Sequence, residues 1–412
     1  MGYYYLFTAL IFLTALFTYI NFKFIKWPAT IAVMVFSLLC SVLLLVFRQF
    51  FPSLTIAVAQ SISAINFHDL VMRILLGFLL FAGAYHTNIF QFEKELKPVL
   101  SLAVISTTVS TFCVGTLLYL VFLLLHIDIS YINCLLFGAL ISPTDPIAAL
   151  GILRKIGAPR TFEQKITGES LFNDGIAIVL FTTLMDMAQQ NVMGNVFVSA
   201  IQLFLKEAGG GLLYGGVLGL IGFFTLKSTD SYKVAILITL TMAMAGYTFA
   251  YIIHVSAPIS IVVAGLICSR SKSIVFTRED QDYVSTFWNL IDGFLNVVLF
   301  LLMGFEMLVI NVNWIIFVIG VLCIAILLLS RFVSLLIPYY MHRNYFERNT
   351  LILLTWGGMR GAVSIALALS LPEALHRNEF LPITYLVAIF SITVQGLTIG
   401  KMVKSAYAIK DK

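Results

Sequence analysis

The stretch Gly168–Phe181, GESLFNDGIAIVLF, places four polar side chains at the start of a long apolar run. A carboxylate inside a membrane-spanning helix costs roughly 3 kcal/mol on insertion scales, so such a residue indicates a functional site. Residues four apart lie on the same face of a helix, which pairs Ser170 with Asp174 and Glu169 with Asn173. The whole cluster therefore indicates a buried polar site rather than a single polar residue kept for helix packing.

Composition places this site in a lipid bilayer. Of the 412 residues, 60% are hydrophobic and only 11% are charged, whereas a soluble domain has about 25% charged residues. The chain is therefore expected to be an all-α polytopic membrane protein. We expect residues 1–412 to form a single transmembrane domain with no soluble regulatory domain. The five cysteines have no metal-ligand spacing and no basic run contains interleaved aromatics, so no cofactor and no nucleic acid are expected.

Thirteen stretches are apolar and long enough to be read as membrane spans, although the one at 256–269 is short. They are residues 3–22, 27–47, 70–89, 98–125, 131–153, 168–188, 209–226, 233–253, 256–269, 293–311, 313–340, 349–371 and 380–403. Three further segments, 50–68, 194–207 and 278–292, mix polar and apolar residues. These three are predicted to be interfacial helices or re-entrant loops.

The distribution of basic residues predicts the orientation of the chain. An odd number of spans puts the two termini on opposite sides of the membrane. With the N-terminus outside, most of the 25 Lys and Arg residues fall in the inner loops and the C-terminal tail. Since cytoplasmic loops carry an excess of Lys and Arg, the N-terminus is expected outside and the C-terminus in the cytoplasm.

Two of the spans contain residues that interrupt a helix. The fifth contains SPTDP at Ser142–Pro146, where two prolines remove amide donors and clash with preceding carbonyls. The twelfth contains WGGMRG at Trp356–Gly361, with three glycines and an arginine in mid-span. Interrupted spans in corresponding positions of two halves indicate an inverted-repeat transporter with its site where the breaks meet. Two kinks without function are the simpler alternative, but kinks seldom carry a buried Asp and a buried Arg.

The ionisable residues predicted to lie inside the membrane are Asp145, Glu169, Asp174, Glu306, Arg331 and Arg360. Four acids face two bases, so at least one carboxylate lacks a neutralising partner. Such a group either takes a proton or recruits a cation. We expect Asp174 to bind a proton or a small monovalent cation in competition, and we treat Glu306 as a candidate auxiliary acid.

Each break exposes carbonyl oxygens and the ends of half-helix dipoles, which need compensating charge. Carbonyls freed near Thr144 can coordinate a cation. Asp145 either ligates that cation or balances the amide end of the second half-helix, and Arg360 would balance the carbonyl end of the first half-helix in its own span. Compensation of helix dipoles is favoured over direct ligation for both residues.

Four motifs together resemble the monovalent cation:proton antiporter family, in its branch of NhaP-type antiporters and animal sodium/proton exchangers. They are GESLFND, SPTDP, WGGMRGAVS and FWNLIDGFLNVVLFLLMGFEM, and the resemblance covers nearly the whole chain. It implies a fold with inverted repeats and two crossed broken helices. It also implies a moving core of about 98–188 and 313–403, a dimerisation part of about 1–89 and 209–311, and a homodimer that works by an elevator-like motion.

The resemblance also implies roles for individual residues. Asp174 matches the carrier of cation and proton, and Asn173 is its non-titrating neighbour where electrogenic relatives have a second Asp, which implies electroneutral exchange. Ser170, Thr144 and Asp145 match further positions of a Na⁺ site. Glu169 matches an acid that pairs with an arginine of the eleventh span, which is Arg331 here.

The function expected from these matches is exchange of Na⁺ or Li⁺ for H⁺ by alternating access. The protein is expected in a prokaryotic inner membrane, where the exchange would contribute to pH homeostasis. Many relatives have an acid in the third span where this chain has Ala82, so the preferred cation stays open and K⁺/H⁺ exchange is the nearest alternative. An intramembrane aspartyl protease using Asp145 and Asp174 is a remote alternative from a different class, because it needs two carboxylates that share a proton.

Overall fold

The computed structural model describes residues 2–50, 52–189, 196–271, 278–310, 313–347 and 349–407. Within these ranges all regular secondary structure is helical, and no strand occurs. The α-helices are α1 (Gly2–Ile20), α2 (Ala29–Val46), α3 (Pro52–Ser63), α4 (Phe67–Asp69), α5 (Leu76–His86), α6 (Ile89–Ser101), α7 (Thr107–Leu124), α8 (Tyr131–Ile141), α9 (Ile147–Ile156), α10 (Arg160–Gln189), α11 (Val196–Lys227), α12 (Tyr232–Thr241), α13 (Tyr247–Ile252), α14 (Ala257–Ser269), α16 (Arg278–Glu306), α17 (Trp314–Met341), α18 (Thr350–Gly357), α19 (Ala362–Ser370), α20 (Arg377–Phe390) and α21 (Gly396–Ala406). Short π-helical segments join α4 to α5, α6 to α7, α12 to α13 and α20 to α21.

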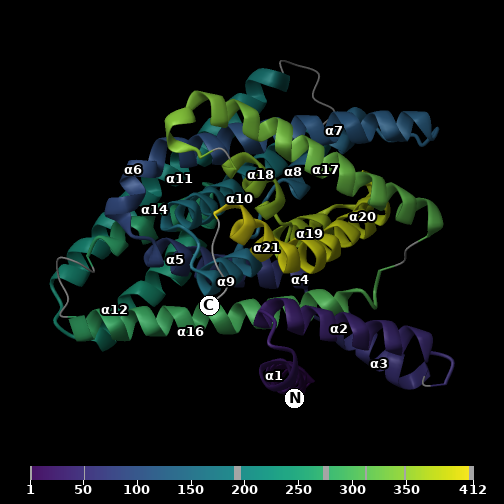
Figure 1. Cartoon of the computed structure of the whole chain (residues 1–412), viewed down its shortest axis with the longest axis horizontal. Coiled ribbons are helices and arrows are strands. Elements are labelled where there is room, and N and C mark those ends of the chain that lie inside the picture. Colours follow the sequence, from purple (N-terminus) through teal and green to yellow (C-terminus); the bar gives the residue numbers. More distant parts are fainter. Residues whose placement is uncertain are drawn as a thin grey trace.

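The short broken helices lie at the centre of the molecule and long helices run around them. In Figure 1, α8, α10, α18 and α19 occupy the middle of the view, with α16 running below them and α17 crossing diagonally on the upper side. The long helix α16 packs on α2, α5 and α12, whereas α17 packs on α7, α18 and α20. The division into a moving core and a dimerisation part stays a prediction.

The prediction of an all-α polytopic membrane protein is confirmed. Within the described ranges, ten helices are long and apolar enough to cross a membrane. An eleventh span is the bent pair α18 and α19, whose axes differ by 48°. The other two predicted spans correspond to the shorter apolar helices α8 and α14. Each of the thirteen predicted stretches thus has a helical counterpart.

Two of the segments predicted to be interfacial or re-entrant belong instead to long helices. Residues 278–292 form the first half of α16 and continue without a break to Glu306. Of residues 194–207, those from Val196 onward form the beginning of α11, which runs to Lys227. Their polar side chains mislead a hydropathy window, because a polar face is compatible with a helix that packs on protein or lines a cavity.

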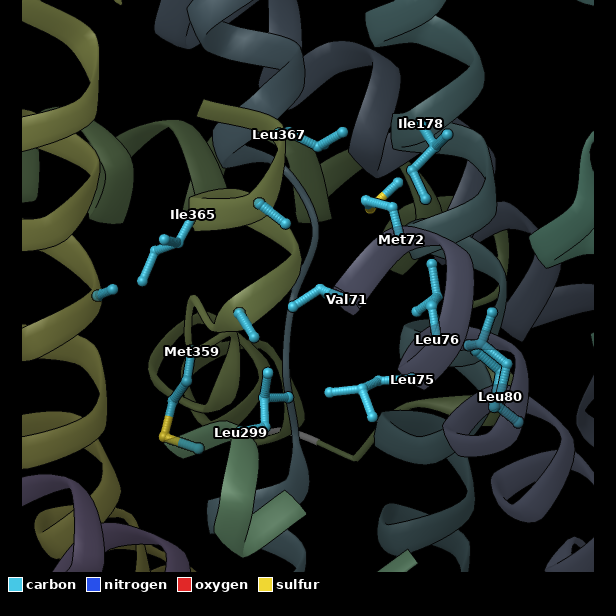
Figure 2. Close-up of a cluster of buried hydrophobic side chains, with 14 of the residues drawn as sticks. Val71, Met72, Leu75, Leu76, Leu80, Ile178, Leu299, Met359, Ile365 and Leu367 are labelled. Atoms are coloured by element: carbon cyan, nitrogen blue, oxygen red, sulfur yellow. The ribbon is translucent and has the colours of Figure 1, made fainter. Parts of the chain in front are cut away.

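Apolar side chains from separate parts of the chain close the core around the broken helices. Figure 2 shows side chains from the π-helical segment before α5, from α5 itself, from α10, from α16 and from α19 converging on one region. The labelled side chains are Val71, Met72, Leu75, Leu76, Leu80, Ile178, Leu299, Met359, Ile365 and Leu367. This packing holds the ends of the half-helices in place, so that polar groups can be kept at a fixed depth in the protein.

Candidate functional site: two helix breaks and a buried carboxylate

The first break separates α8 from α9 at residues 142–146. Pro143 and Pro146 lack the amide donors that a continuous helix would need there. The carboxylate of Asp145 replaces part of the missing bonding, because its Oδ1 accepts a hydrogen bond of 3.0 Å from the N–H of Ile147. Asp145 thus places a negative group at the amide end of α9, where the helix dipole favours it.

The second break separates α18 from α19 and contains Arg360, which is buried. Its Nη1 donates hydrogen bonds to the carbonyl oxygens of Ser142 and Pro143, the latter at 3.1 Å. These carbonyls follow the end of α8, so the hydrogen bonds of Arg360 go to the other broken helix. Compensation of the dipole of its own half-helix stays a prediction. The guanidinium supplies positive charge at the carbonyl end of the other broken helix, which the linear order of residues could not reveal.

The two breaks are also joined through their backbones. The N–H of Asp145 donates a hydrogen bond of 2.7 Å to the carbonyl of Met359. A Cβ atom added at Gly361 would lie 2.2 Å from Oδ2 of Asp145, so only glycine fits at this approach. The breaks therefore meet, as non-helical backbone at membrane depth requires.

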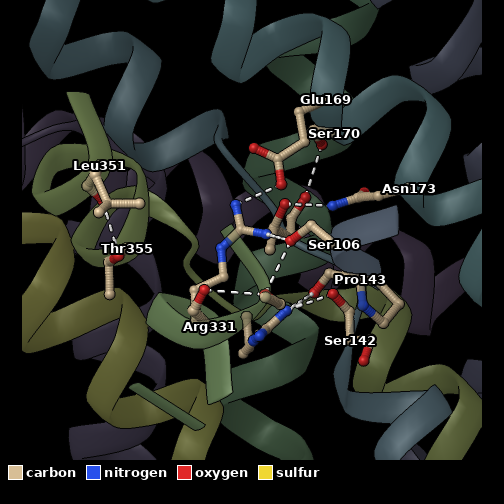
Figure 3. A network of polar contacts seen from close by, with 12 residues as sticks. Ser106, Ser142, Pro143, Glu169, Ser170, Asn173, Arg331, Leu351 and Thr355 are labelled. Atoms are coloured by element: carbon tan, nitrogen blue, oxygen red, sulfur yellow. Dashed lines mark hydrogen bonds and ion pairs between the residues drawn. The ribbon is translucent and has the colours of Figure 1, made fainter. Parts of the chain in front are cut away.

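Two polar side chains of the long helix α10 donate hydrogen bonds to the first break. Ser170 Oγ donates a hydrogen bond of 2.7 Å to the carbonyl of Thr144. Asn173 Nδ2 donates one of 2.6 Å to Thr144 Oγ1. Figure 3 shows both contacts above the break. The amide of Asn173 is thus committed to positioning Thr144, while its Oδ1 has no hydrogen-bond partner in the described part of the chain.

Asp174 differs from its neighbours because nothing in the described ranges pairs with it. Its side chain is only 8% exposed, and no hydrogen bond or ion pair to a described residue reaches its carboxylate. The acidic side chain of Asp145 lines the same cavity as Asp174 and offers no neutralising charge. The residue therefore carries an uncompensated charge unless it holds a proton or a cation.

Asp174 opens onto a cavity of about 960 Å³. Thr144, Asp145 and Ser170 line the same cavity, so carboxylate, hydroxyl and carbonyl oxygens are available together. These hard oxygen donors and the freed carbonyls of a broken helix suit a small monovalent cation as cargo. The lining also includes basic residues of loops and helix ends, namely Lys26, Arg154, Lys155 and Arg160.

Glu169 and Arg331 form an ion pair, and both side chains are almost completely buried. Nη1 of Arg331 also donates a hydrogen bond of 3.2 Å to Ser106 Oγ, which lies 3.0 Å from Ser334 Oγ. Figure 3 shows the guanidinium between the carboxylate and the serine. Neither residue lines the cavity, so this pair joins α10 to α17 beside the candidate cation site.

Glu306 lies outside the site. It is the last residue of α16, it is buried, and it does not line the cavity that contains Asp174. Ala82 is completely buried on α5 and does not line that cavity either. The structure thus brings together all of the predicted cation-site residues but not the candidate auxiliary acid.

Two further polar residues of the cavity have no assigned role in the sequence-based expectations. Asp292 and Asn296 of α16 both line it. They are four residues apart, a spacing that puts both on one helix face. That spacing is the signal in the sequence, but the predicted boundary between residues 278–292 and 293–311 separates Asp292 from Asn296.

A family model described as "Sodium/hydrogen exchanger, transmembrane" matches residues 11–405. The Na⁺/H⁺ antiporter NhaP of Pseudomonas aeruginosa is 40% identical over 408 residues, which cover 97% of this chain and 96% of that protein. The Na⁺/H⁺ antiporter NhaH of Halobacillus dabanensis is 35% identical over 350 residues, covering 82% of each chain.

The fold also matches a solved structure. The sodium proton antiporter MjNhaP1 from Methanocaldococcus jannaschii, solved at pH 8, superposes with a TM-score of 0.74 at 18% sequence identity. The match covers 98% of both chains, so the two proteins share their fold over the entire helical framework.

Proposed function

The chain belongs to the sodium/hydrogen exchanger family, and we propose that it exchanges Na⁺ for H⁺ with Asp174 as the group that carries both. The observation that carries this proposal is the contrast between two buried acids of α10. Glu169 is neutralised by Arg331, whereas Asp174 has no basic partner among the described residues and faces a cavity. Only a group without a permanent partner can exchange one bound ion for another.

The exchange follows from competition at one carboxylate. In the protonated form Asp174 is neutral and cannot hold Na⁺. In the ionised form it attracts Na⁺, and Ser170, Thr144 and Asp145 supply further oxygens around it. Because the uncompensated charge is costly in the protein interior, the site is filled by one ion or the other whenever the carrier crosses the membrane.

We propose that the exchange is electroneutral, one Na⁺ or Li⁺ for one proton. Asn173 occupies the position beside Asp174 and cannot ionise. Its amide is already engaged with Thr144, which supports a positioning role. The cycle then moves one positive charge in each direction.

The proposal includes an orientation and a location. The basic residues lining the cavity, such as Arg154 and Lys155, are expected in cytoplasmic loops, so the cavity would lead from Asp174 to the cytoplasm of a prokaryotic cell. The N-terminus would then lie outside. By resemblance to the family, the protein would work as a homodimer by an elevator-like motion and contribute to pH homeostasis.

The family consists of transporters, so the chain is not an enzyme and the alternative of an intramembrane aspartyl protease is wrong. K⁺/H⁺ exchange uses the same machinery and stays the alternative within the class.

Sealed vesicles containing the purified protein test the proposal. Proton flux is followed with a pH-sensitive dye while Na⁺, Li⁺ and K⁺ are added in turn, and Asp174→Asn is the matched variant. We expect flux with Na⁺ and Li⁺, little with K⁺, and none in the variant, which should keep its thermal stability because it loses no pairing. Flux with K⁺ alone would favour the alternative, and undiminished flux in Asp174→Asn would reject the carrier assignment.

A further inference from the structure

One polar face of α16 forms part of the cavity wall. Asn289, Asp292 and Asn296 all line the cavity, and their spacings of three and four residues put them on one side of the helix. This helix carries neither break and packs on α2 and α5. The polar face is therefore a separate contribution to the cavity, from an element that is not one of the broken helices.

Asp292 and Asn296 are joined in a defined way. Asn296 Nδ2 donates a hydrogen bond of 3.0 Å to Asp292 Oδ1. A carboxylate cannot donate, so this bond fixes which end of the amide faces Asp292. The Asn296 side chain is only 2% exposed, and its Oδ1 has no hydrogen-bond partner in the described ranges. A buried amide oxygen without a donor costs free energy, which a ligand of positive charge can recover.

The charges around Asp292 leave it short of positive partners. Within the described part of the chain no lysine, arginine or histidine forms an ion pair with it. Arg154 and Asp145 line the same cavity as Asp292. The carboxylates of Asp145, Asp174 and Asp292 thus line one cavity. Because the basic residues of the lining form no ion pair with these three acids in the described ranges, the acids focus a negative potential on the space between them.

We propose that Asp292 and Asn296 form a second cation-binding site in the cavity, which holds a monovalent cation before it reaches Asp174. The inference rests on the proposed function, because it assigns this site the same cargo. The Asp292 carboxylate supplies the charge and the Asn296 amide supplies a neutral oxygen. A cation bound at Asp292 is also attracted by the negative charge of Asp145. This attraction draws the cation towards the helix breaks and keeps it from staying bound at α16.

Loss of the Asp292 charge should change the Na⁺ concentration at which transport is half-saturated. In vesicles where the cavity side faces the added Na⁺, Asp292→Asn should raise the half-saturating Na⁺ concentration roughly tenfold, the lower end of what a focused charge does to a local ion concentration. Turnover at saturating Na⁺ should fall by a smaller factor. Asp292→Glu, which keeps the charge, should restore most of the apparent affinity.

A matched control lies on the same helix. Asp282 is exposed and does not line the cavity, so Asp282→Asn removes one carboxylate from α16 without touching the proposed site. It should leave the half-saturating concentration unchanged. If Asp292→Asn folds poorly, Asn296→Leu removes the amide oxygen at similar volume and should also raise the half-saturating concentration. Thermal melting of each purified variant identifies a folding defect.

Variants of Asp292 and Asn296 test the second site separately from the carrier Asp174. If Asp292→Asn and Asn296→Leu both fold and keep the wild-type half-saturating concentration, the second site does not exist, whatever Asp174 does. Conversely, stabilisation by Na⁺ in thermal melts should persist in Asp174→Asn and disappear in the double variant Asp174→Asn/Asp292→Asn. Transport by Asp174→Asn would reject the carrier assignment without bearing on the Asp292 readout.

Discussion

Arg360 of one broken helix donates a hydrogen bond to the carbonyl oxygen of Ser142 in the other. The two residues are 218 positions apart in the chain. A helix that ends inside a membrane leaves its last carbonyls without hydrogen-bond donors. Arg360 of the second break supplies donors to the carbonyls that follow α8 in the first break. The same meeting point carries the backbone bond from Asp145 to Met359.

Removing the Arg360 guanidinium should therefore damage α8 rather than α18. We expect Arg360→Gln to lower stability by about 2–3 kcal/mol, the value of hydrogen bonds to a charged group, and to reduce transport strongly. Arg360→Lys should recover only part of both, because an ammonium lacks the planar fork that reaches two carbonyls. Thermal melting and vesicle flux measure these effects. Arg343→Gln, at an exposed position, is the control and should resemble the wild type.

The ion pair between Glu169 and Arg331 should be needed for stability. Glu169→Gln or Arg331→Gln strands one buried charge, which costs about 3–5 kcal/mol. The double variant removes both charges and should melt closer to the wild type than either single variant. Wild-type melting temperatures in both single variants would show that the pair does not hold α10 to α17.

Gly361 should not tolerate even a methyl group. A Cβ there would lie 2.2 Å from Oδ2 of Asp145, so Gly361→Ala must displace that carboxylate or the backbone. We expect Na⁺-driven proton flux to fall by roughly tenfold or more, since misplacement by about 1 Å can cost about a hundredfold. Gly209→Ala is the matched control. Nothing lies within 4 Å of its added Cβ in α11, so flux should be unaffected.

The stoichiometry can be measured with an imposed membrane potential. Electroneutral exchange predicts that a potassium diffusion potential leaves the initial rate of the wild type unchanged. Asn173→Asp adds a second ionisable group beside Asp174 and loses the amide that donates to Thr144. A rate that responds to voltage in the wild type would contradict one-for-one exchange.

The sequence by itself determined the membrane class, the position of nearly every helix and the location of both breaks. These properties are local: an apolar run of sufficient length must be helical in lipid, and closely spaced prolines or glycines interrupt it where they stand. The same local logic singled out Asp174, Glu169 and Asp145 as ionisable groups that lipid would exclude.

Tertiary structure alone decided which groups meet. Hydropathy separates residues 278–292 from the following span, whereas in the structure they form the first half of α16. Trp288 there packs on Phe81 of α5 and donates a hydrogen bond to Thr239 of α12, and Asp292 lines the cavity. Tertiary packing also brings Arg360 to the carbonyls of Ser142 and Pro143, just after the end of α8. The physical reason is that charge compensation depends on distance in space, and two half-helices that cross bring together groups that no spacing along the chain relates.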